Sequence, residues 1–478
     1  MLTLINTNRM TPPIGPIGLD YVGCAARQAG RQVALVDLGL AADPEAALRA
    51  HFAGPRPRLV GLSFRNIDDC FWPSGESFVP GLAETVRKVR GLTDAPIVVG
   101  GVGFSILAES LLEACGADFG IRGDGEAATV ALLSELDGRR RFERVPGLLW
   151  REDGHVRSNP PAWPESLAIP ARRDLVDNRA YFERGGQGGV ETKRGCARRC
   201  VYCADPLAKG RTARTRSPAE VADELEALLA QGVDVLHLCD SEFNLPPEHA
   251  RAVCDELLGR GLGRRARWYT YMAVVPFDAD LADRMARAGC VGINFTGDSA
   301  SEAMLRAYGQ PHRPEDLRAA VVLSRERGMA VMIDLLLGGP GETPETVAET
   351  VGFMKEIGPD CVGAALGLRI CPGTTIAARI AAEGPMEANP AVRRRYDGPI
   401  DLVRPTFYIS RALGARPARL VKDLVAGDER FFEPTEEAPG DADSTDHNYN
   451  DNRELVAAIA AGARGAYWHI LRRLRDGV

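Results

Sequence analysis

The sequence contains no apolar run of the roughly 20 residues that a membrane-spanning helix requires. It also has no excess of positive charge, since its formal net charge is −7 at pH 7. That balance argues against a protein that binds nucleic acid through bulk charge. The first ten residues, MLTLINTNRM, lack a basic segment followed by a long apolar core, so we expect no signal peptide.

Disulfide-framework spacing is absent as well. Eleven cysteines are spread over 478 residues without regular intervals, unlike the pattern of small secreted domains. We interpret most of them as small buried apolar residues in a protein of the reducing cytoplasm. The chain is 45% hydrophobic and 26% charged, which is enough to build two or three folded domains.

The first 135 residues alternate between short apolar runs and helical patterns. The candidate strands are 2–5, 33–36, 59–63, 96–99 and 119–121. This rhythm predicts a parallel, doubly wound sheet, whose ligands bind beyond the carboxyl ends of the strands. Three of those ends carry LSFRN, GGVGF and RGDGE, whose glycines would let backbone approach a large ligand. Ordinary strand-to-helix turns are the alternative.

Residues 136–188 are interpreted as a connector that contains a small hairpin over 145–160. A second alternation then fills 189–394 with six strand–helix units. The candidate strands are 189–192, 233–239, 267–274, 291–296, 330–337 and 361–369. Six units predict a (β/α)6 partial barrel with its site at the strand carboxyl ends. Residues 395–478 form a mixed segment, which we expect to end in one helix over 455–474.

The most informative stretch is KRGCARRCVYCADP, which spans 193–206 and spaces three cysteines as C-x3-C-x2-C. Thiolates are the usual ligands of iron–sulfur clusters, and three of them on one loop can hold three corners of a [4Fe–4S] cube. The fourth iron then stays open to another ligand. Basic residues crowd the loop and would favour thiolates. The candidate metal ligands are Cys196, Cys200 and Cys203.

Zinc is the main competing metal. A structural zinc site requires a fourth cysteine or histidine nearby. The nearest candidates, His237 and Cys239, fall on the next predicted strand. A zinc-stabilised α/β binding protein without redox chemistry therefore remains an alternative.

The three-cysteine motif, with Tyr202 before its last cysteine, resembles the radical S-adenosylmethionine (SAM) superfamily. The resemblance covers about 189–370 and implies that the open iron binds SAM. It also implies SAM contacts from DSEFN after the second barrel strand, TGDS after the fourth and CPGT after the sixth. The residues assigned in this way are Asp240, Ser241, Glu242, Asp298, Ser299 and Cys371. Asp298 would hold the ribose hydroxyls, because a carboxylate accepts two hydrogen bonds.

Two further positions carry competing interpretations. Glu220 follows Ser217 and Pro218, which predicts a helix capping box, but its carboxylate could instead lean toward the open iron as a catalytic group. Thr343, in the segment GGPGET, resembles part of the family's glycine-rich turn. We expect it to act as a helix N-cap.

The doubly wound first domain resembles the cobalamin-binding domain of the B12-dependent radical SAM subgroup. The only histidine in the first 150 residues, His51, is badly placed to ligate cobalt, so we expect no histidine ligand. The corrin would lie near Ser63, Arg65 and Asn66. The resemblance assigns further contacts with the cofactor to Gly100, Gly101, Gly103, Gly123 and Glu126.

SFRNIDDC resembles the tryptophan C2-methyltransferases of thiopeptide biosynthesis, in which an arginine occupies this region. The Arg65 guanidinium cannot donate a lone pair to cobalt. It would disfavour a lower ligand and ease the loss of methyl as a cation. A surface or phosphate-pairing arginine is the alternative.

Together these resemblances imply an enzyme that methylates an unreactive carbon of a small-molecule or peptide precursor through methylcobalamin. A radical route and a polar route both remain open, and Arg65 favours the polar one. A B12-dependent radical cyclisation or rearrangement without net methyl transfer is the alternative. The expected cofactors are a [4Fe–4S] cluster, SAM and cobalamin, with a reducing electron donor as partner. The segments RPTFYIS and DHNYNDN are candidates for substrate contact.

Overall fold

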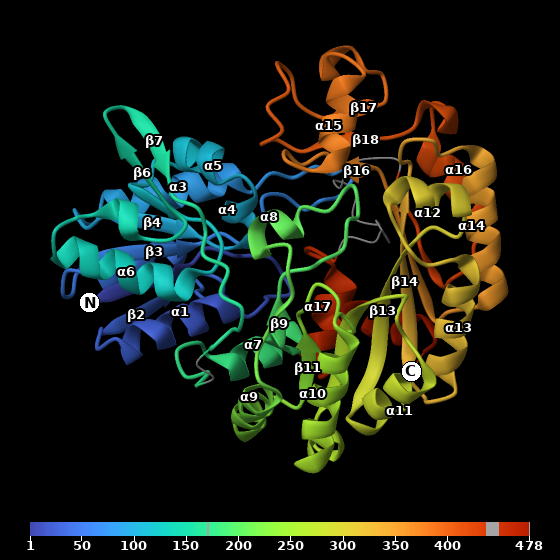
Figure 1. The fold of residues 1–478 in the computed structure, drawn as a ribbon, viewed down its shortest axis with the longest axis horizontal. Coiled ribbons are helices and arrows are strands. Elements are labelled where there is room, and N and C mark those ends of the chain that lie inside the picture. Colours follow the sequence, from blue (N-terminus) through green and yellow to red (C-terminus); the bar gives the residue numbers. More distant parts are fainter. Residues whose placement is uncertain (170–171, 436–448, 478) are drawn as a thin grey trace.

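The computed structural model describes residues 1–169, 172–435 and 449–477. Two seven-stranded sheets organise two units that lie beside each other, with the N-terminal unit in blue and cyan (Figure 1). None of the helices in the described ranges combines the length and the apolarity that a bilayer crossing needs.

The first sheet has the order β2-β1-β3-β4-β5-β6-β7 and is parallel from β2 to β5. Its strands are β1 (Leu2–Asn6), β2 (Val33–Asp37), β3 (Leu59–Ser63), β4 (Ile97–Gly100), β5 (Phe119–Ile121), β6 (Leu148–Glu152) and β7 (His155–Ser158). Separate apolar clusters cover its two faces. The doubly wound arrangement expected from the apolar runs is therefore present.

Helices on both faces form those clusters. One face packs against α2 (Pro44–Phe52), α3 (Val79–Arg90) and α5 (Ala108–Cys115). The other packs against α1 (Ile17–Gln28) and α6 (Gly125–Asp137). Between β4 and α5 lies the short helix α4 (Val102–Ile106).

The hairpin predicted inside the connector does more than link the two units. Its strands β6 and β7 add antiparallel to β5. The first sheet therefore extends to Ser158, and a boundary at residue 135 would cut through it. Pairing with β6 satisfies the backbone groups that β5 would otherwise expose as an edge strand.

The second sheet has the order β19-β15-β14-β13-β12-β11-β8, and every neighbouring pair is parallel. Its strands are β8 (Gly188–Val190), β11 (Val235–Leu238), β12 (Arg267–Ala273), β13 (Cys290–Asp298), β14 (Ala330–Leu337), β15 (Cys361–Leu366) and β19 (Phe431–Phe432). The edge strands β8 and β19 do not pair with each other. The result is the open, partial barrel that six strand–helix units predicted, with one further strand from the C-terminal segment.

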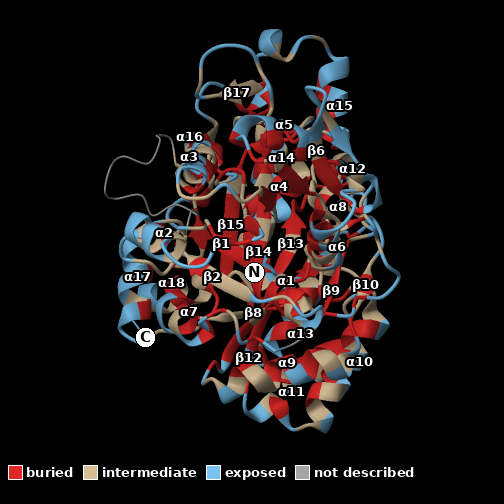
Figure 2. Cartoon of the chain, turned by 90° about the vertical axis from the view of Figure 1, so that its left-hand side faces the viewer, coloured by how far each residue is buried: buried red, intermediate tan, exposed pale blue. Residues whose placement is uncertain are grey.

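Helices cover the outside of this barrel, and Figure 2 shows the buried strands enclosed by helices with exposed outer faces. They are α9 (Pro218–Ala230), α10 (Pro247–Gly259), α11 (Ala279–Arg287), α13 (Pro314–Arg325) and α14 (Pro344–Ile357). The capping box of Thr343 starts α14, which confirms its expected role as an N-cap. Smaller elements near the barrel mouth are β9 (Lys193–Arg194), α8 (Asp205–Lys209) and β10 (Arg214–Thr215).

Two expectations for the C-terminal part are wrong. The sixth barrel strand ends at Leu366, because Gly367 turns the chain with φ +92° into a small antiparallel sheet. That sheet comprises β16 (Leu368–Arg369), β17 (Val392–Arg394) and β18 (Thr406–Tyr408). The single final helix is in fact two, α17 (Arg453–Ala460) and α18 (Tyr467–Arg475). Gly462 and Gly465 separate them with φ values of +105° and +144°, which a continuing helix does not permit.

The last helix, α18, packs against the amino-terminal ends of the barrel strands. Trp468 is 4% exposed, and its ring lies 6.1 Å from that of Tyr269 on β12. It also lies next to Gly292, near the start of β13. Helix α18 therefore covers the amino-terminal ends of these strands and does not act as a lid at their carboxyl ends.

Buried ion pairs fix the first unit on the barrel. Arg173 of the connector binds Asp20 of α1 at 2.9 Å and Glu224 of α9 at 2.7 Å, and all three side chains are at most 2% exposed. The hydroxyl of Tyr21 also donates to Glu224. Charges buried this deeply are tolerated only when paired, so the network fixes how the units dock.

Candidate active site

The three cysteines lie on the loop between β9 and α8, directly after the first barrel strand. This loop is held in a defined conformation. The backbone N–H of Cys196 donates to the carbonyl of Gly210. Gly195 adopts φ +87°, and a side chain there would lie 2.1 Å from the carbonyl oxygen of Thr212. All three cysteines are half-buried and free of disulfides.

Their thiols are poor acids in this environment. Burial raises the pKa of Cys200 to about 12, with a further contribution from the Asp298 carboxylate. Burial and then Asp205 raise the pKa of Cys203 to about 12 as well. These thiols stay protonated until a metal displaces their protons, which is how metal binding couples to cysteine ionisation.

Ion pairs occupy several of the basic residues near the loop, whereas Arg198 does lower the pKa of Cys196 and Cys200, although less than burial raises it. Lys193 binds Asp240 at 2.7 Å. Arg194 binds Glu126 at 2.8 Å and Glu191 at 2.9 Å. Two further arginines are paired in the same way, Arg214 with Asp124 and Arg216 with Glu224.

The spacing of the ligands bears on the choice of metal. In the described part of the chain, no three His, Cys, Asp or Glu side chains converge closely enough to hold one metal ion. A structural zinc ion requires four ligands that converge on one point. A cluster needs only one thiolate for each of its irons, so thiols grouped on one loop but not converging fit a cluster better.

Asp240, expected to contact SAM, is already fully engaged. Its carboxylate accepts hydrogen bonds from the backbone and hydroxyl of Thr192 and from the ammonium of Lys193. Burial opposes its ionisation, but these partners outweigh burial and hold the pKa of Asp240 below its ordinary value. Asp240 therefore orients the start of the cysteine loop. Its neighbour Ser241 donates to Asp205 at the start of α8.

Glu242 is the residue of this segment with hydrogen-bonding capacity to spare. Its Oε1 accepts a hydrogen bond of 2.9 Å from Thr296, whereas Oε2 is buried and has no hydrogen-bond partner in the described ranges. Burial raises the pKa of Glu242 to about 7. The carboxylate lies close enough to Cys196 and Cys200 to raise the pKa of both thiols. An amine near the cysteine loop would find an acceptor here.

Asp298 ends β13 with an unusual φ of +58°, which directs its carboxylate toward the cysteine loop. Its Oδ2 accepts hydrogen bonds from the hydroxyl of Tyr202 and from the amide of Gln310. Burial raises the pKa of Asp298 to about 6. Gln310 also lies 3.4 Å from the sulfur of Cys200. Gln310 stands outside every motif, so no pattern along the chain pointed to it.

Two predicted site residues have structural hydrogen-bond partners, and a third does not end a barrel strand as expected. The carboxylate of Glu220 accepts from the backbone N–H of Ser217, so the capping box occupies it. Ser299 shares a hydrogen bond of 2.9 Å with Thr350 of α14. Cys371 is buried beyond the small antiparallel sheet and does not end a barrel strand.

The glycines of the first unit serve protein contacts. A Cβ on Gly101, whose φ is +109°, would lie 2.6 Å from the carbonyl oxygen of Phe64, and one on Gly103 would lie 2.9 Å from Arg65 backbone. The loops after β3 and β4 therefore pack directly on each other. A Cβ on Gly123 would meet Trp163 at 3.0 Å, and Gly100 faces Ile121.

The other corrin-side candidates lie on the same carboxyl-end edge. The carbonyl of Ser63 accepts from the hydroxyl of Thr7, and the amide of Asn66 lies 3.8 Å from the sulfur of Met10. These contacts tie the loop after β1 to the loop after β3. Glu126 faces the barrel, where it pairs with Arg194.

Arg65 is exposed on its loop, and its guanidinium lies close enough to residues of the barrel unit to shift their pKa values. Burial lowers the pKa of His237 to about 4, and the Arg65 guanidinium lowers it further. The same guanidinium opposes the rise in pKa that burial imposes on Cys239, Tyr271 and Tyr467. We call the space bounded by these five residues the inter-unit hollow.

Aromatic residues dominate the barrel side of this hollow. Tyr271 is 40% exposed although β12 is an inner strand, and its ring lies 5.0 Å from His237. Tyr467 packs 5.7 Å from Tyr449, the first described residue of the DHNYNDN segment; residues 446–448 lie outside the described ranges. His237 interrupts an apolar strand, a signal by which the sequence could have indicated the site.

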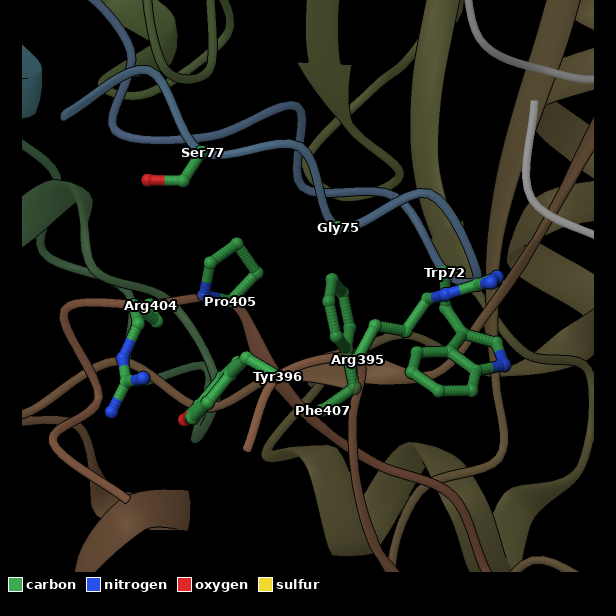
Figure 3. Close-up of a pocket in the computed structure, with 8 residues that line it drawn as sticks. All are labelled: Trp72, Gly75, Ser77, Arg395, Tyr396, Arg404, Pro405 and Phe407. Carbon is green, nitrogen blue, oxygen red and sulfur yellow. The ribbon is translucent and has the colours of Figure 1, made fainter. Parts of the chain in front are cut away.

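A separate cavity of about 130 Å³ lies where the loop after β3 meets the small antiparallel sheet (Figure 3). Trp72 and Phe407 stand 5.8 Å apart on its wall. Arg395 extends toward Trp72 and donates to the carbonyl of Pro73. Part of the RPTFYIS segment thus lines this cavity and packs against the first unit.

Family comparisons agree with this two-unit arrangement. Residues 5–133 match the model of the B12 binding domain, and residues 190–354 match that of the radical SAM superfamily. The chain is 30% identical to a tryptophan 2-C-methyltransferase from Streptomyces laurentii, over 98% of this chain and 95% of that protein.

Solved structures agree as well. The radical SAM methyltransferase TsrM from Kitasatospora setae, with tryptophan and a SAM analogue bound, superposes with a TM-score of 0.91 at 32% identity. The match covers 100% of this chain and 99% of that one. The same enzyme with cobalamin and a [4Fe–4S] cluster gives a TM-score of 0.90 at 31% identity.

Proposed function

We propose, for a chain that belongs to the cobalamin-dependent radical SAM methyltransferases, that it methylates a ring carbon of tryptophan or of a closely similar indole amino acid. The observation that carries this proposal is the inter-unit hollow. There an arginine of the B12-binding unit faces Tyr271, His237 and Tyr467 of the barrel. A hollow walled by aromatic rings suits a flat aromatic substrate.

The cofactors are a [4Fe–4S] cluster, SAM and cobalamin. In our proposal Cys196, Cys200 and Cys203 bind the cluster through the three thiolates of one loop. Glu242 would accept a hydrogen bond from the SAM amine through its buried Oε2. Asp298, positioned by Tyr202 and Gln310, would receive the ribose hydroxyls.

SAM supplies the methyl group, and cobalamin carries it to carbon. Arg65 contributes a fixed positive charge at the edge of the B12-binding unit and offers no lone pair to the metal. With cobalamin bound, Arg65 would place a positive charge beside the corrin without acting as a ligand, which would favour polar transfer. The proposal includes a reducing electron donor as partner, because accidental oxidation of the cofactors would otherwise end turnover.

The test uses protein that is reconstituted anaerobically with iron, sulfide and hydroxocobalamin, then supplied with SAM and L-tryptophan. We expect a product that is heavier by one methyl group and that has lost deuterium from tryptophan labelled at ring carbon 2. Polar turnover forms no 5′-deoxyadenosine. A product of unchanged mass would favour a rearrangement and overturn the proposal, and so would the absence of any tryptophan-derived product.

A further inference from the structure

The barrel sheet carries a set of polar side chains at the middle of its strands, beside Tyr271 of the inter-unit hollow. Tyr271 of β12 pairs in register with Asn294 of β13. Asn294 in turn pairs with Met332 of β14, two residues before Asp334. A sheet whose inner face only packed against apolar residues would have no use for an amide and a carboxylate here.

Asn294 and Asp334 are joined by a hydrogen bond. The amide Nδ2 of Asn294 donates to Oδ2 of Asp334 at 2.9 Å. This contact fixes the orientation of the amide, so the remaining atom, Oδ1, is an acceptor. Asn294 is only 5% exposed, and its Oδ1 has no hydrogen-bond partner within the described part of the chain. Buried acceptors are almost always satisfied, so an unmatched one points to a donor that arrives from outside.

The surroundings favour a positively charged donor. The Asp334 carboxylate lies close enough to raise the pKa of Tyr271 and of Tyr449. The Tyr449 hydroxyl lies 3.9 Å from the sulfur of Met332, the residue that pairs with Asn294. Tyrosine faces attract cations, and a carboxylate beside an amide oxygen does so more strongly. A neutral N–H donor would gain less from the negative charge of Asp334 than an ammonium group would.

We propose that Asn294 Oδ1 and the Asp334 carboxylate form the acceptor pair that binds the ammonium group of an amino-acid substrate. The inference rests on the proposed function and adds the polar contact that selects an amino acid over a simple indole. Asn294 and Asp334 bind substrate in this assignment and take no part in methyl transfer. Holding the ammonium at mid-strand leaves the aromatic ring free to lie against Tyr271 and His237.

The experiment compares L-tryptophan with indole-3-propionate, which keeps the ring and the carboxylate but lacks the amine. Dissociation constants are measured by calorimetry on the reconstituted holoenzyme and on its Asn294→Ala and Asp334→Asn variants. We expect each variant to weaken tryptophan binding about ten- to a hundredfold, as for the loss of a hydrogen bond to a charged group. Indole-3-propionate should bind all three proteins within about threefold.

An internal control separates binding from folding. The change in the corrin spectrum on adding SAM without tryptophan should be the same in both variants as in the parent, because neither residue is among the proposed contacts of the cluster or of SAM. Equal weakening of both ligands in the variants, or no weakening of either, would overturn the inference and leave the proposed function intact. If the parent holoenzyme bound neither ligand, the tryptophan proposal itself would fail.

Discussion

Arg369, at the end of β16, donates a hydrogen bond of 2.8 Å to Asp68 on the loop that carries Arg65. The two side chains are 7% and 2% exposed. Arg369 also donates to the carbonyl oxygens of Ile370 and Leu402. One buried guanidinium thus joins the small antiparallel sheet and the segment before β18 to the loop that carries Arg65.

Arg369→Met should therefore lower the free energy of unfolding by about 3–5 kcal/mol, because it leaves the Asp68 carboxylate buried without a counterion. Arg404→Met is the matched control. Arg404 pairs with Asp401 at 2.8 Å, but these side chains are 37% and 45% exposed. Loss of an exposed pair costs at most about 1 kcal/mol. Equal losses in denaturant unfolding would show that the buried pair does not hold the loop.

The cysteine loop gives the sharpest test of cluster binding. Alanine at Cys196, Cys200 or Cys203 should reduce the iron content of anaerobically purified protein to background, since each substitution removes the only protein ligand of one iron and leaves two thiolates to hold the cluster. Cys239→Ala is the control, because that half-buried thiol lies on the next strand of the barrel. Iron content and the absorbance of the brown cluster are the measurements. Zinc in the parent protein, retained by the alanine variants, would contradict the assignment.

Most strands were predictable because each is a short apolar run closed by a glycine or a polar residue. The strand over Ala330–Leu337 agrees to the residue, and β3 does as well. The break between α17 and α18 was readable in AGARG, but the apolar spacing on both sides concealed it. The hairpin was found, while its attachment to β5 was not, because pairing across a sheet edge leaves no local pattern.

The site was predictable only where chemistry is concentrated in one segment, as in the three cysteines. The partners of Asp240 could not be foreseen, because the Lys193 that neutralises it lies 47 positions away along the chain. Tyr271 looked like a core residue of an apolar strand and is instead the most exposed aromatic in the hollow. Such assignments depend on which strand face borders open space, a property of the assembled barrel.

Arg65 tests the polar route. Arg65→Leu removes the positive charge and opens the corrin side of the hollow to a water ligand. We expect methyl transfer to slow about tenfold or more, equivalent to about 1.4 kcal/mol in the barrier. Electron paramagnetic resonance of the reduced, cobalamin-loaded protein should report a new lower ligand. Arg56→Leu, on an exposed loop remote from the strand carboxyl ends, should change neither quantity. An unchanged rate of methyl transfer in Arg65→Leu would show that Arg65 is a surface arginine without a role in the reaction.

Glu242 should impose a pH dependence on the stability of the cofactor-free protein. Burial raises its pKa from its ordinary value of 4.5 to about 7, so the folded protein holds this carboxyl neutral where the unfolded chain ionises it. The resulting penalty is absent below about pH 4.5 and grows as the pH rises through 7. Glu242→Gln keeps the shape and removes the charge. At pH 8 the free energy of unfolding of this variant should be about 1–3 kcal/mol higher than that of the parent, and at pH 4.5 the two should be equal.

The same substitution should weaken SAM binding to the cluster-loaded protein, because a glutamine oxygen is a weaker acceptor for an amine than a carboxylate. A residue that binds SAM but destabilises the fold would give this result, in which one substitution raises stability and weakens SAM binding. Thr296→Val, which removes the hydroxyl that donates to Oε1, is the control. It should raise the pKa of Glu242 further and extend upward the pH range over which the penalty grows. A Glu242→Gln variant that was less stable than the parent at every pH would show that the carboxylate has a structural partner instead.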